Sequence, residues 1–459
     1  MVYPMHFNTN EERGMMNVRL FKMGLFIMMA VVMVLVTTGC NLFNSNENDN
    51  NDDDIHADVV LRGNITKNKT LFAKDSIVLA GQTFVKSGVT LTIEKGTTIY
   101  SLADDGKGLA PALVIERGAR IIAEGTVDEP ITFTSALPQE ILNRNPWGNW
   151  GGLIILGNAP VNIGETYIEG LVGVPYGGND PEDNSGILKY VRVWHGGRSI
   201  GQDNEINGIT FGGVGRGTTV EYCEVAYNLD DGFEMFGGTV DIKYCAAIFC
   251  ADDYFDTDLG YQGRGQFLFA LLGAKEANRA FEMDNDGSNM DLQPRSFPQF
   301  HNVTIIGSGE SASADNDQCI RLREGTGGDF RNMIIYQGKD YAVRISDDPT
   351  IALVANEHAN STAPNYIYFS PNNIIYGTPN AYRGDNGIFA FIDEDPGFSV
   401  EGREDGGQVN VLPAVNGQAF QDVDELPNDG FFEQVNFKGA FGVANWLDGW
   451  SILYEKGRF

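Results

Sequence analysis

The sequence predicts an all-β fold, a right-handed parallel β-helix whose short strands stack from one coil to the next. The first observation is a repeat in the middle of the chain. Segments 233–236, 255–258, 281–284 and 320–323 each alternate an apolar residue with a candidate for the outer surface. Such alternation is typical of a strand with one buried face. The first three segments begin 22 and 26 residues apart, and recurrence at this length indicates a solenoid.

Two further observations favour the same fold. The pattern L-x-I-E-x-G at residues 91–96 returns at 113–118, which is 22 residues later. Glycine is abundant, at 56 of 459 residues, as a fold with a turn every few residues requires. The length and the 42% hydrophobic content could support two or three domains. A solenoid, however, grows by adding rungs and remains one array.

The chain is strongly acidic. Its formal charge is −30, from 62 acidic and 32 basic residues. Such a field repels nucleic acid and anionic lipid headgroups, so no nucleic-acid partner is expected, and it favours metal ions or cationic ligands. The alternative is that the acids only keep an exported protein in solution.

Residues 1–39 are predicted to be a lipoprotein signal peptide. Basic residues precede an apolar run at 23–36, which is shorter than the roughly 20 residues of a membrane span. The Thr-Thr-Gly-Cys that follows resembles a bacterial lipobox, with Thr37 where Leu is usual. The resemblance implies acylation of Cys40, which would anchor the protein to a membrane without spanning it. The alternative is a signal peptide that is cleaved elsewhere.

Residues 40–58 are predicted to be an acidic, flexible tether. Residues 41–54 are rich in Asn and Asp and contain few apolar side chains, so they cannot pack into a core. An acidic tract soon after an acylated Cys resembles the surface-export signal of Bacteroidota lipoproteins. This resemblance implies a lipid-anchored protein of the outer membrane, displayed at the cell surface.

Residues 59–426 are predicted to form the β-helix. From the start of this region, short runs of alternating β-branched and polar residues break at glycine, which is the signal of a strand followed by a turn. The continuous apolar run at 153–156 predicts a buried strand. The Gly-rich residues 158–181 are expected to leave the coil as a loop, and residues 366–376 to form one more rung.

Residues 427–459 are predicted to cap the last rung. A solenoid ends in an open apolar face with exposed strand edges, which must be covered. A carbohydrate-stacking surface is the alternative. The aromatic residues of this segment lie at irregular spacing: Phe431, Phe432, Phe437, Phe441, Trp446 and Trp450.

Two cysteines share the repeat spacing. Cys223 and Cys245 are 22 residues apart, which places them on neighbouring strands whose separation of about 4.8 Å lies inside the Cα range of a disulfide. A disulfide is one interpretation if the protein is exported. A ladder of two buried thiols is the other.

The outer residues of the four repeated segments form two predicted columns. Stacked carboxylates about 4.8 Å apart repel by roughly 1 kcal/mol even in water, and several-fold more at an effective dielectric near 20. A bound cation, the arginines at the end of the columns or raised pKa values must offset this repulsion. The first column reads Glu234, Asp256, Glu282 and Arg321, and the second reads Phe236, Asp258, Asp284 and Arg323.

Two Asp-Asp pairs, 22 residues apart, come just before these columns. Calcium suits a site of this kind because it takes six to eight oxygen ligands in flexible geometry. The predicted metal ligands are Asp230, Asp231, Asp252, Asp253, Asp256 and Asp258. The predicted ligand-binding residues are Glu234, Glu282, Asp284, Arg321 and Arg323.

Several longer stretches carry a family resemblance. LTIEKGTTI, WGNWGGLIILGNAPVN, NLDDGFEMFGGTV and FKGAFG followed by NWLDGWSIL resemble a family of right-handed parallel β-helix lipoproteins of the Bacteroidota outer membrane. That family is similar to a leptospiral outer-membrane lipoprotein. The resemblance covers residues 59–459 and carries no catalytic residue. Some members are encoded beside TonB-dependent receptors, which implies a transport partner of that class.

Three functions remain open at this point. The first is a surface protein that binds calcium, a glycan or a peptide, or that assists a TonB-dependent receptor. The second is a structural adhesin or spacer whose columns are salt-laced ladders. The third is an enzyme on acidic polysaccharide, because pectin-lyase-like β-helices include lyases, which use calcium and a basic residue, and hydrolases, which use paired aspartates.

Overall fold

A computed structural model describes residues 55–168, 171, 173–198, 206–354, 366–383, 389–404 and 406–459. The predicted signal peptide, Cys40 and the tether up to residue 54 lie outside these ranges. The chain divides into two compact units, Met1–Asp58 and Val59–Phe459. Within the described ranges, no helix has the length and apolar character needed to cross a membrane.

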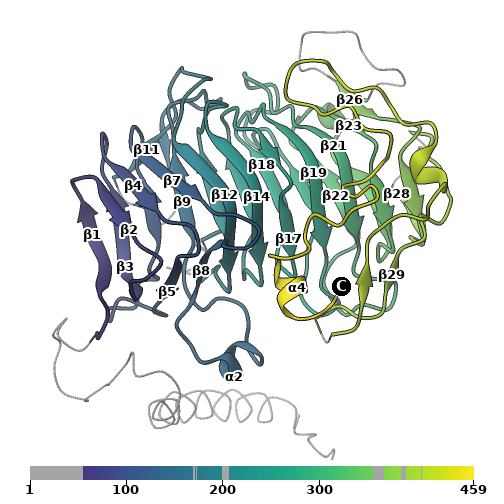
Figure 1. Cartoon of the computed structure of the whole chain (residues 1–459). Helices are drawn as coiled ribbons and strands as arrows, with labels where there is room; N and C mark the ends of the chain where they lie inside the picture. The colour runs from purple at the N-terminus through teal and green to yellow at the C-terminus, as the bar shows by residue number, and fades with distance from the viewer. Residues whose placement is uncertain are drawn as a thin grey trace, which may run out of the picture. The chain divides into compact units, whose positions relative to one another are not determined.

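The predicted all-β parallel β-helix is confirmed (Figure 1). One sheet system of 26 strands winds through the unit, and every pairing within it is parallel. Its strands are β1 (Val59–Ile65), β2 (Lys69–Leu71), β3 (Ile77–Val85), β4 (Thr90–Ile93), β5 (Thr98–Ser101), β6 (Leu113–Ile115), β7 (Arg120–Glu124), β8 (Ile131–Ser135), β9 (Leu153–Leu156), β12 (Gly186–Trp194), β13 (Ile209–Gly212), β14 (Thr219–Ala226), β15 (Phe233–Phe236), β16 (Ile242–Lys243), β17 (Ala246–Ile248), β18 (Phe255–Asp258), β19 (Arg264–Leu271), β20 (Phe281–Met283), β21 (Gln299–Ile306), β22 (Gln318–Leu322), β23 (Gly328–Arg331), β24 (Ile334–Tyr336), β25 (Tyr341–Ile345), β26 (Ile367–Phe369), β27 (Ile374–Tyr376) and β28 (Asn380–Arg383).

The remaining elements are short. Two antiparallel pairs, β10 (Thr166–Tyr167) with β11 (Pro175–Tyr176) and β29 (Ser399–Val400) with β30 (Val409–Asn410), lie in excursions from the coil. The helices are α2 (Gln139–Leu142), α3 (Asp348–Ile351), α4 (Ile452–Glu455) and the 3-10 turn η2 (Gln418–Phe420).

Each full coil contributes to three parallel sheets, which we call A, B and C. Sheet A holds β2, β4, β7, β16, β23 and β26 with the first halves of β12, β14, β19 and β21. Sheet B holds β5, β8, β17, β24 and β27 with the first halves of β1 and β3 and the second halves of β12, β14, β19 and β21. Sheet C holds β6, β9, β13, β15, β18, β20, β22, β25 and β28 with the second halves of β1 and β3.

Stacked identical side chains fill the interior between the sheets. The ring centroids of Phe233 and Phe255 are 5.1 Å apart, and those of Phe255 and Phe281 are 4.9 Å apart, with nearly parallel planes. In-register parallel pairing places equivalent residues on top of one another, so a repeated Phe becomes a column of rings. All three phenylalanines are fully buried.

The bend between sheets A and B is made by single residues with positive φ. Tyr190, Tyr222, Tyr244 and Phe267 have φ values between 49° and 57°, a region that bulky side chains rarely adopt. Their rings stack at centroid distances of 4.5, 4.5 and 4.6 Å. This aromatic stacking helps to offset the backbone strain at each bend.

The structure corrects the prediction that residues 427–459 cap the last rung. This segment runs back along the coil instead, and Figure 1 shows it in yellow beside strands from the middle of the unit. Phe432 stacks on His301 at 4.4 Å, and Trp450 packs edge-on against Tyr190 at 5.4 Å. Near the last described coil, Phe389 is buried and its ring lies 5.0 Å from the ring of Phe369. The aromatic residues are spaced irregularly because they contact several different coils beneath the segment, and they do not pack on the end of the solenoid.

The structure also corrects the disulfide between Cys223 and Cys245, because both are free, fully buried thiols. They lie on adjacent coils, since Glu221 pairs with Lys243 and Glu224 with Ala246 on either side of the two cysteines. In-register side chains point the same way and stay about 4.8 Å apart, whereas a disulfide needs a Cβ separation of about 3.5–4.5 Å. The thiol ladder is therefore the arrangement found.

Candidate functional site

The outer face of sheet C changes character along the coil. Its first part is apolar and covered, because Val114, Ile154 and Leu156 pack against the excursion that carries β10 and β11. Tyr176 of β11 is 1% exposed and closes this part, with its ring against the backbone of Gly212. The excursion is the loop predicted at 158–181. Where this cover ends, the charged part of the sheet begins.

The first predicted column is confirmed by the strand register. Glu234 pairs with Asp256, Asp256 with Glu282, and Glu282 with Arg321. The column then continues through Arg344 to Arg383. Arg383 was missed because the loop before it breaks the regular spacing.

The second column lies beside the first. Asp258 follows Phe236 in register, and the Asp284 backbone N–H donates to Thr257 O at 2.7 Å. Arg323 Nε donates to both carboxylate oxygens of Asp284, at 2.9 and 2.8 Å. The second column is thus brought together as predicted.

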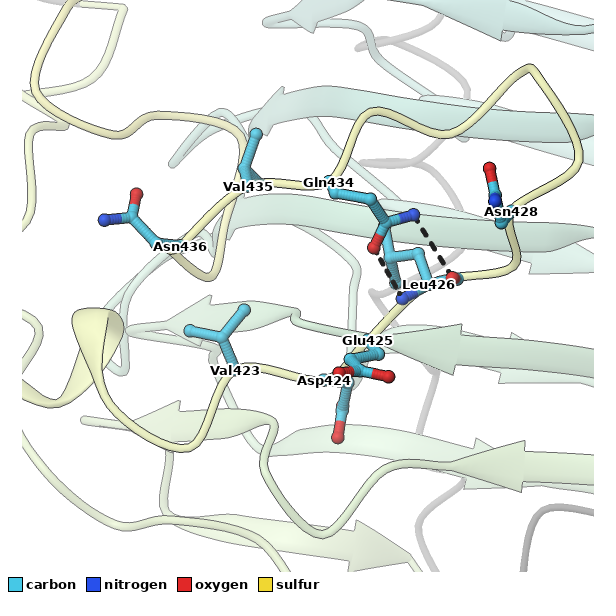
Figure 2. A pocket seen from close by; sticks show the side chains of 8 residues that line it. All are labelled: Val423, Asp424, Glu425, Leu426, Asn428, Gln434, Val435 and Asn436. Atoms are coloured by element: carbon cyan, nitrogen blue, oxygen red, sulfur yellow. Dashed lines mark hydrogen bonds between the residues drawn. The ribbon is translucent and has the colours of Figure 1, made fainter.

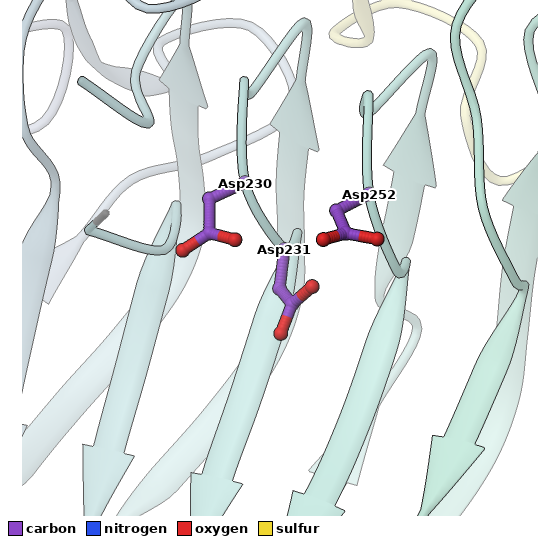
Figure 3. A group of neighbouring side chains, drawn as sticks. All are labelled: Asp230, Asp231 and Asp252. Carbon is purple, nitrogen blue, oxygen red and sulfur yellow. The ribbon is translucent and has the colours of Figure 1, made fainter. Parts of the chain in front are cut away.

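The two Asp-Asp pairs lie in the turns before β15 and β18. Figure 3 shows Asp230, Asp231 and Asp252 gathered at the start of these strands. Three groups of carboxyl groups have ligand atoms within 4.8 Å of one another. We call them the first triad (Asp230, Asp231, Asp252), the second triad (Asp231, Glu234, Asp256) and the third triad (Asp253, Asp256, Glu282).

Five of the six predicted metal ligands therefore belong to these triads, together with Glu234 and Glu282, which were predicted to bind a ligand. Asp258 belongs to none of them. It faces Asp284, and its Oδ1 accepts a hydrogen bond from the Leu259 backbone N–H at 2.6 Å.

Arginines neutralise the far end of the acidic region. Arg321 Nη1 lies 3.4 Å from Glu282 Oε1, and Arg323 Nη2 lies 3.1 Å from Glu282 Oε2. Arg279, which the sequence interpretation missed, reaches Asp253 at 3.5 Å and Glu282 at 3.3 Å. Its position three residues before Glu282 is the signal that could have found it.

The second triad has no such partner. Within the described part of the chain, no Lys or Arg forms an ion pair with Asp231, Glu234 or Asp256. Asn207 Nδ2 donates to Glu234, and Asp231 Oδ1 accepts from the Asp253 backbone N–H at 3.0 Å. Asp256 Oδ1 is closed to solvent and accepts no hydrogen bond. Three acids thus meet without a positive charge.

This arrangement raises the pKa values of the acids. Burial, and then the neighbouring carboxylates, raise the pKa of Asp231, Glu234 and Asp256 well above the usual values. Burial raises the pKa of Asp258 to about 7, and it raises that of Asp284 to about 8 against the opposing charge of Arg323. Protons are therefore retained near neutral pH unless a cation replaces them.

A hollow lies in the loop around the start of the C-terminal segment (Figure 2). All of its lining residues fall within 423–428 and 434–436. The Gln434 side chain bridges the Leu426 backbone N–H and carbonyl, at 3.2 Å each. The loop thereby holds its own shape, and none of the predicted site residues lines this hollow.

Comparison with known proteins agrees with the fold. Residues 63–375 match the family model described as a pectate-lyase-like β-helix domain. The match covers more than half of the chain, so the protein belongs to this family. No curated protein and no solved structure matches the chain. The likeness to Bacteroidota and leptospiral lipoproteins stays a prediction.

Proposed function

We propose that this protein is a surface-displayed lipoprotein whose β-helix binds a ligand through a divalent cation, with calcium as the preferred ion. The observation that carries the proposal is the second triad: three acids converge with no basic side chain, and one oxygen is buried without a donor. Removing such a group from water is costly unless a charge or a donor compensates it. A calcium ion would supply that charge.

The arginine end of the same column supports a role beyond ion binding. Arg321, Arg344 and Arg383 occupy successive strands next to the acids. A ligand that carries an anionic group could contact an arginine and the cation together, since guanidinium groups pair with carboxylates in bidentate geometry. A glycan or a peptide with acidic groups fits this description.

The location is part of the proposal. Acylation at Cys40, an acidic tether and display on the outer membrane would leave the β-helix free to meet ligands outside the cell. Association with a TonB-dependent receptor would make the protein an accessory for uptake. Pull-down from native membranes tests this association, and palmitate labelling that Cys40→Ala abolishes tests the anchor.

Thermal unfolding with and without calcium tests the ion site. The full-length protein in detergent should show a Tm several degrees higher in millimolar calcium than in chelator, because a ligand that binds only the folded state stabilises it. Asp256→Asn should remove most of this shift. Glu140→Gln, at an exposed carboxyl group on α2, is the matched control and should keep it. A Tm unaffected by calcium in the wild type would favour the spacer or adhesin instead.

The family membership supports a second candidate, a lyase or hydrolase of acidic polysaccharide. Arg321 beside Glu282 would then be the basic group near the reacting sugar. Release of unsaturated or reducing ends from a panel of acidic glycans, abolished by Arg321→Ala, would establish the enzyme. The absence of products across the panel would favour the binding protein over the enzyme.

A further inference from the structure

The arginine end of the first column carries positive charge that its neighbours do not neutralise. Arg321 pairs in register with Arg344, and Arg344 pairs with Arg383, so the three residues lie on successive strands about 4.8 Å apart. Arg321 reaches Glu282 at 3.4 Å, and Arg383 forms an ion pair with Asp317. The side chain of Arg344, in the middle, forms no hydrogen bond and no ion pair with any described residue.

The arginines cannot relieve their repulsion as the acids of the same column can. A carboxyl group among like charges can keep a proton, whereas a guanidinium group stays charged throughout the pH range in which proteins are folded. Burial and three neighbouring arginines lower the pKa of Arg321, against the attraction of Glu282, but the usual value is so high that the charge remains. A bound anion would neutralise these charges.

Two unused hydrogen-bond donors lie on the same face. Arg321 Nε is closed to solvent and has no acceptor among the described residues. Ser346 follows Arg323 in the second column, because its backbone N–H donates to Leu322 O at 2.8 Å, and strand alternation puts its side chain on the face of Arg344. Ser346 Oγ is also closed to solvent and has no partner in the described part of the chain. Native proteins rarely leave buried polar atoms unsatisfied, and an unseen ion is one reason that they do.

The unused groups are all donors, so they fit a ligand group that only accepts. A guanidinium group has no acceptor atom, and a hydroxyl group can donate one hydrogen bond. A carboxylate has two oxygens in one plane and pairs with one guanidinium fork, whereas a phosphate or sulfate ester has three terminal oxygens that point in different directions. Such an ester group can accept hydrogen bonds from two strands and from the hydroxyl group together.

We propose that Arg321, Arg344 and Ser346 form a site for a tetrahedral oxyanion, which is the phosphate or sulfate ester group of a ligand. This inference rests on the proposed function, because it names the anionic group of the ligand proposed there. Asp256 of the second triad lies two strands before Arg321 in the column, which is a distance of about 10 Å along the sheet. One ligand can therefore reach the cation position and the oxyanion site together.

Calorimetric titration of the full-length protein in detergent, with a chelator present, tests the site without calcium. Sodium sulfate and sodium phosphate are the probes, and sodium acetate at equal ionic strength is the planar control. Sulfate or phosphate should bind saturably and about tenfold or more tightly than acetate. Tighter binding of sulfate would assign a sulfate ester, and tighter binding of phosphate a phosphate ester. Acetate that binds as tightly as both would overturn the tetrahedral site.

Substitutions test the assigned residues. Arg344→Gln should weaken oxyanion binding by about tenfold or more, and Ser346→Ala by about fivefold. Arg344→Lys should recover only part of the loss, because lysine lacks the planar fork. Arg144→Gln, at an exposed arginine after α2, removes the same charge elsewhere and should bind as the wild type does. Near-UV circular dichroism confirms the fold of each variant. Equal weakening by Arg144→Gln and Arg344→Gln, or full recovery in Arg344→Lys, would indicate a general charge effect and overturn the site.

The thermal unfolding experiment with calcium separates this inference from the proposed function. A calcium-dependent rise in Tm without oxyanion binding would overturn the oxyanion site and leave the proposed function standing. Oxyanion binding without such a rise would overturn the proposed calcium site and leave the oxyanion site standing. A folded protein that responds to neither would overturn both.

Discussion

Buried acids on the outer face of sheet A are paired with arginine, whereas the second triad on sheet C is not paired with a basic side chain among the described residues. On sheet A, Arg264 Nε donates to Asp241 Oδ1 at 3.0 Å, and its Nη1 reaches Asp429 of the C-terminal segment at 2.7 Å. Arg331 pairs with Asp329 through two hydrogen bonds of 2.8 Å. On sheet C, the acids of the second triad have no basic partner among the described residues.

The pKa values follow this difference. Burial acts to raise the pKa of Asp329, but the contacts with His301 and Arg331 outweigh it and lower the value. For Asp256, burial and the neighbouring Glu234 act in the same direction and raise the pKa. The same coil can place an arginine beside an acid, so the missing partner on sheet C is a property of the site and not of the fold.

The largest expected effect is on sheet A. Asp329→Ala should destabilise the protein by about 3–5 kcal/mol, because it leaves the mostly buried Arg331 without its carboxylate. Urea unfolding measures the loss. The double variant Asp329→Ala/Arg331→Leu should recover much of it, whereas a double variant as unstable as the single one would mean that the pair is not the cause.

The next largest effect is expected on the pH dependence of stability, which should differ between the acids of sheet A and those of sheet C. Acids whose folded-state pKa is raised stabilise the fold at low pH and lose that contribution as the pH rises through the raised value. Asp258 and Asp284, with pKa values of about 7 and about 8, place this loss between pH 4 and pH 8. Without calcium, the protein should therefore be more stable at pH 5.5 than at pH 8.

Asp329 has the opposite sign, since its lowered pKa contributes stability that is lost only as the pH falls below about 4. Calcium should flatten the slope between pH 5.5 and pH 8, because the ion replaces the protons of the triads. Chemical denaturation at the two pH values, with and without calcium, measures this. A slope that calcium leaves unchanged would contradict the account of sheet C.

The smallest effect is expected at Asp256. In chelator at pH 7, Asp256→Asn should stabilise the protein by about 1 kcal/mol, because the amide keeps the shape and does not have to take up a proton on folding as the carboxyl group does. In calcium, the same variant should be less stable than the wild type. Paired denaturation curves show this change of sign, and a variant less stable under both conditions would indicate a structural carboxylate.

Much of the sheet C column could be predicted from the sequence. The repeated segments recur at a regular spacing, and three of them begin with a phenylalanine that faces inward. Register follows from these two features alone, so Glu234, Asp256, Glu282 and Arg321 were placed together without a structure. Arg279 belongs to no repeated segment and reaches the third triad from the turn before β20, so spacing could not place it.

The C-terminal segment could not be placed for a different reason. Its contacts join residues far apart in sequence, such as Lys243 Nζ with the Phe431 carbonyl at 2.6 Å, and no periodicity links them. Irregular aromatic spacing shows that a segment leaves the repeat but does not show which surface it covers. Sequence reasoning therefore assigned it to the open end of the solenoid.

Calorimetric titration of calcium at pH 7, in two buffers that differ in ionisation enthalpy, tests the central claim most directly. The account predicts saturable binding with release of protons, because the ion displaces protons from carboxyl groups whose pKa values are raised. Glu234→Gln should bind more weakly and release fewer protons. A folded wild-type protein that takes up no calcium, or that binds it with no dependence on the buffer, would contradict the account.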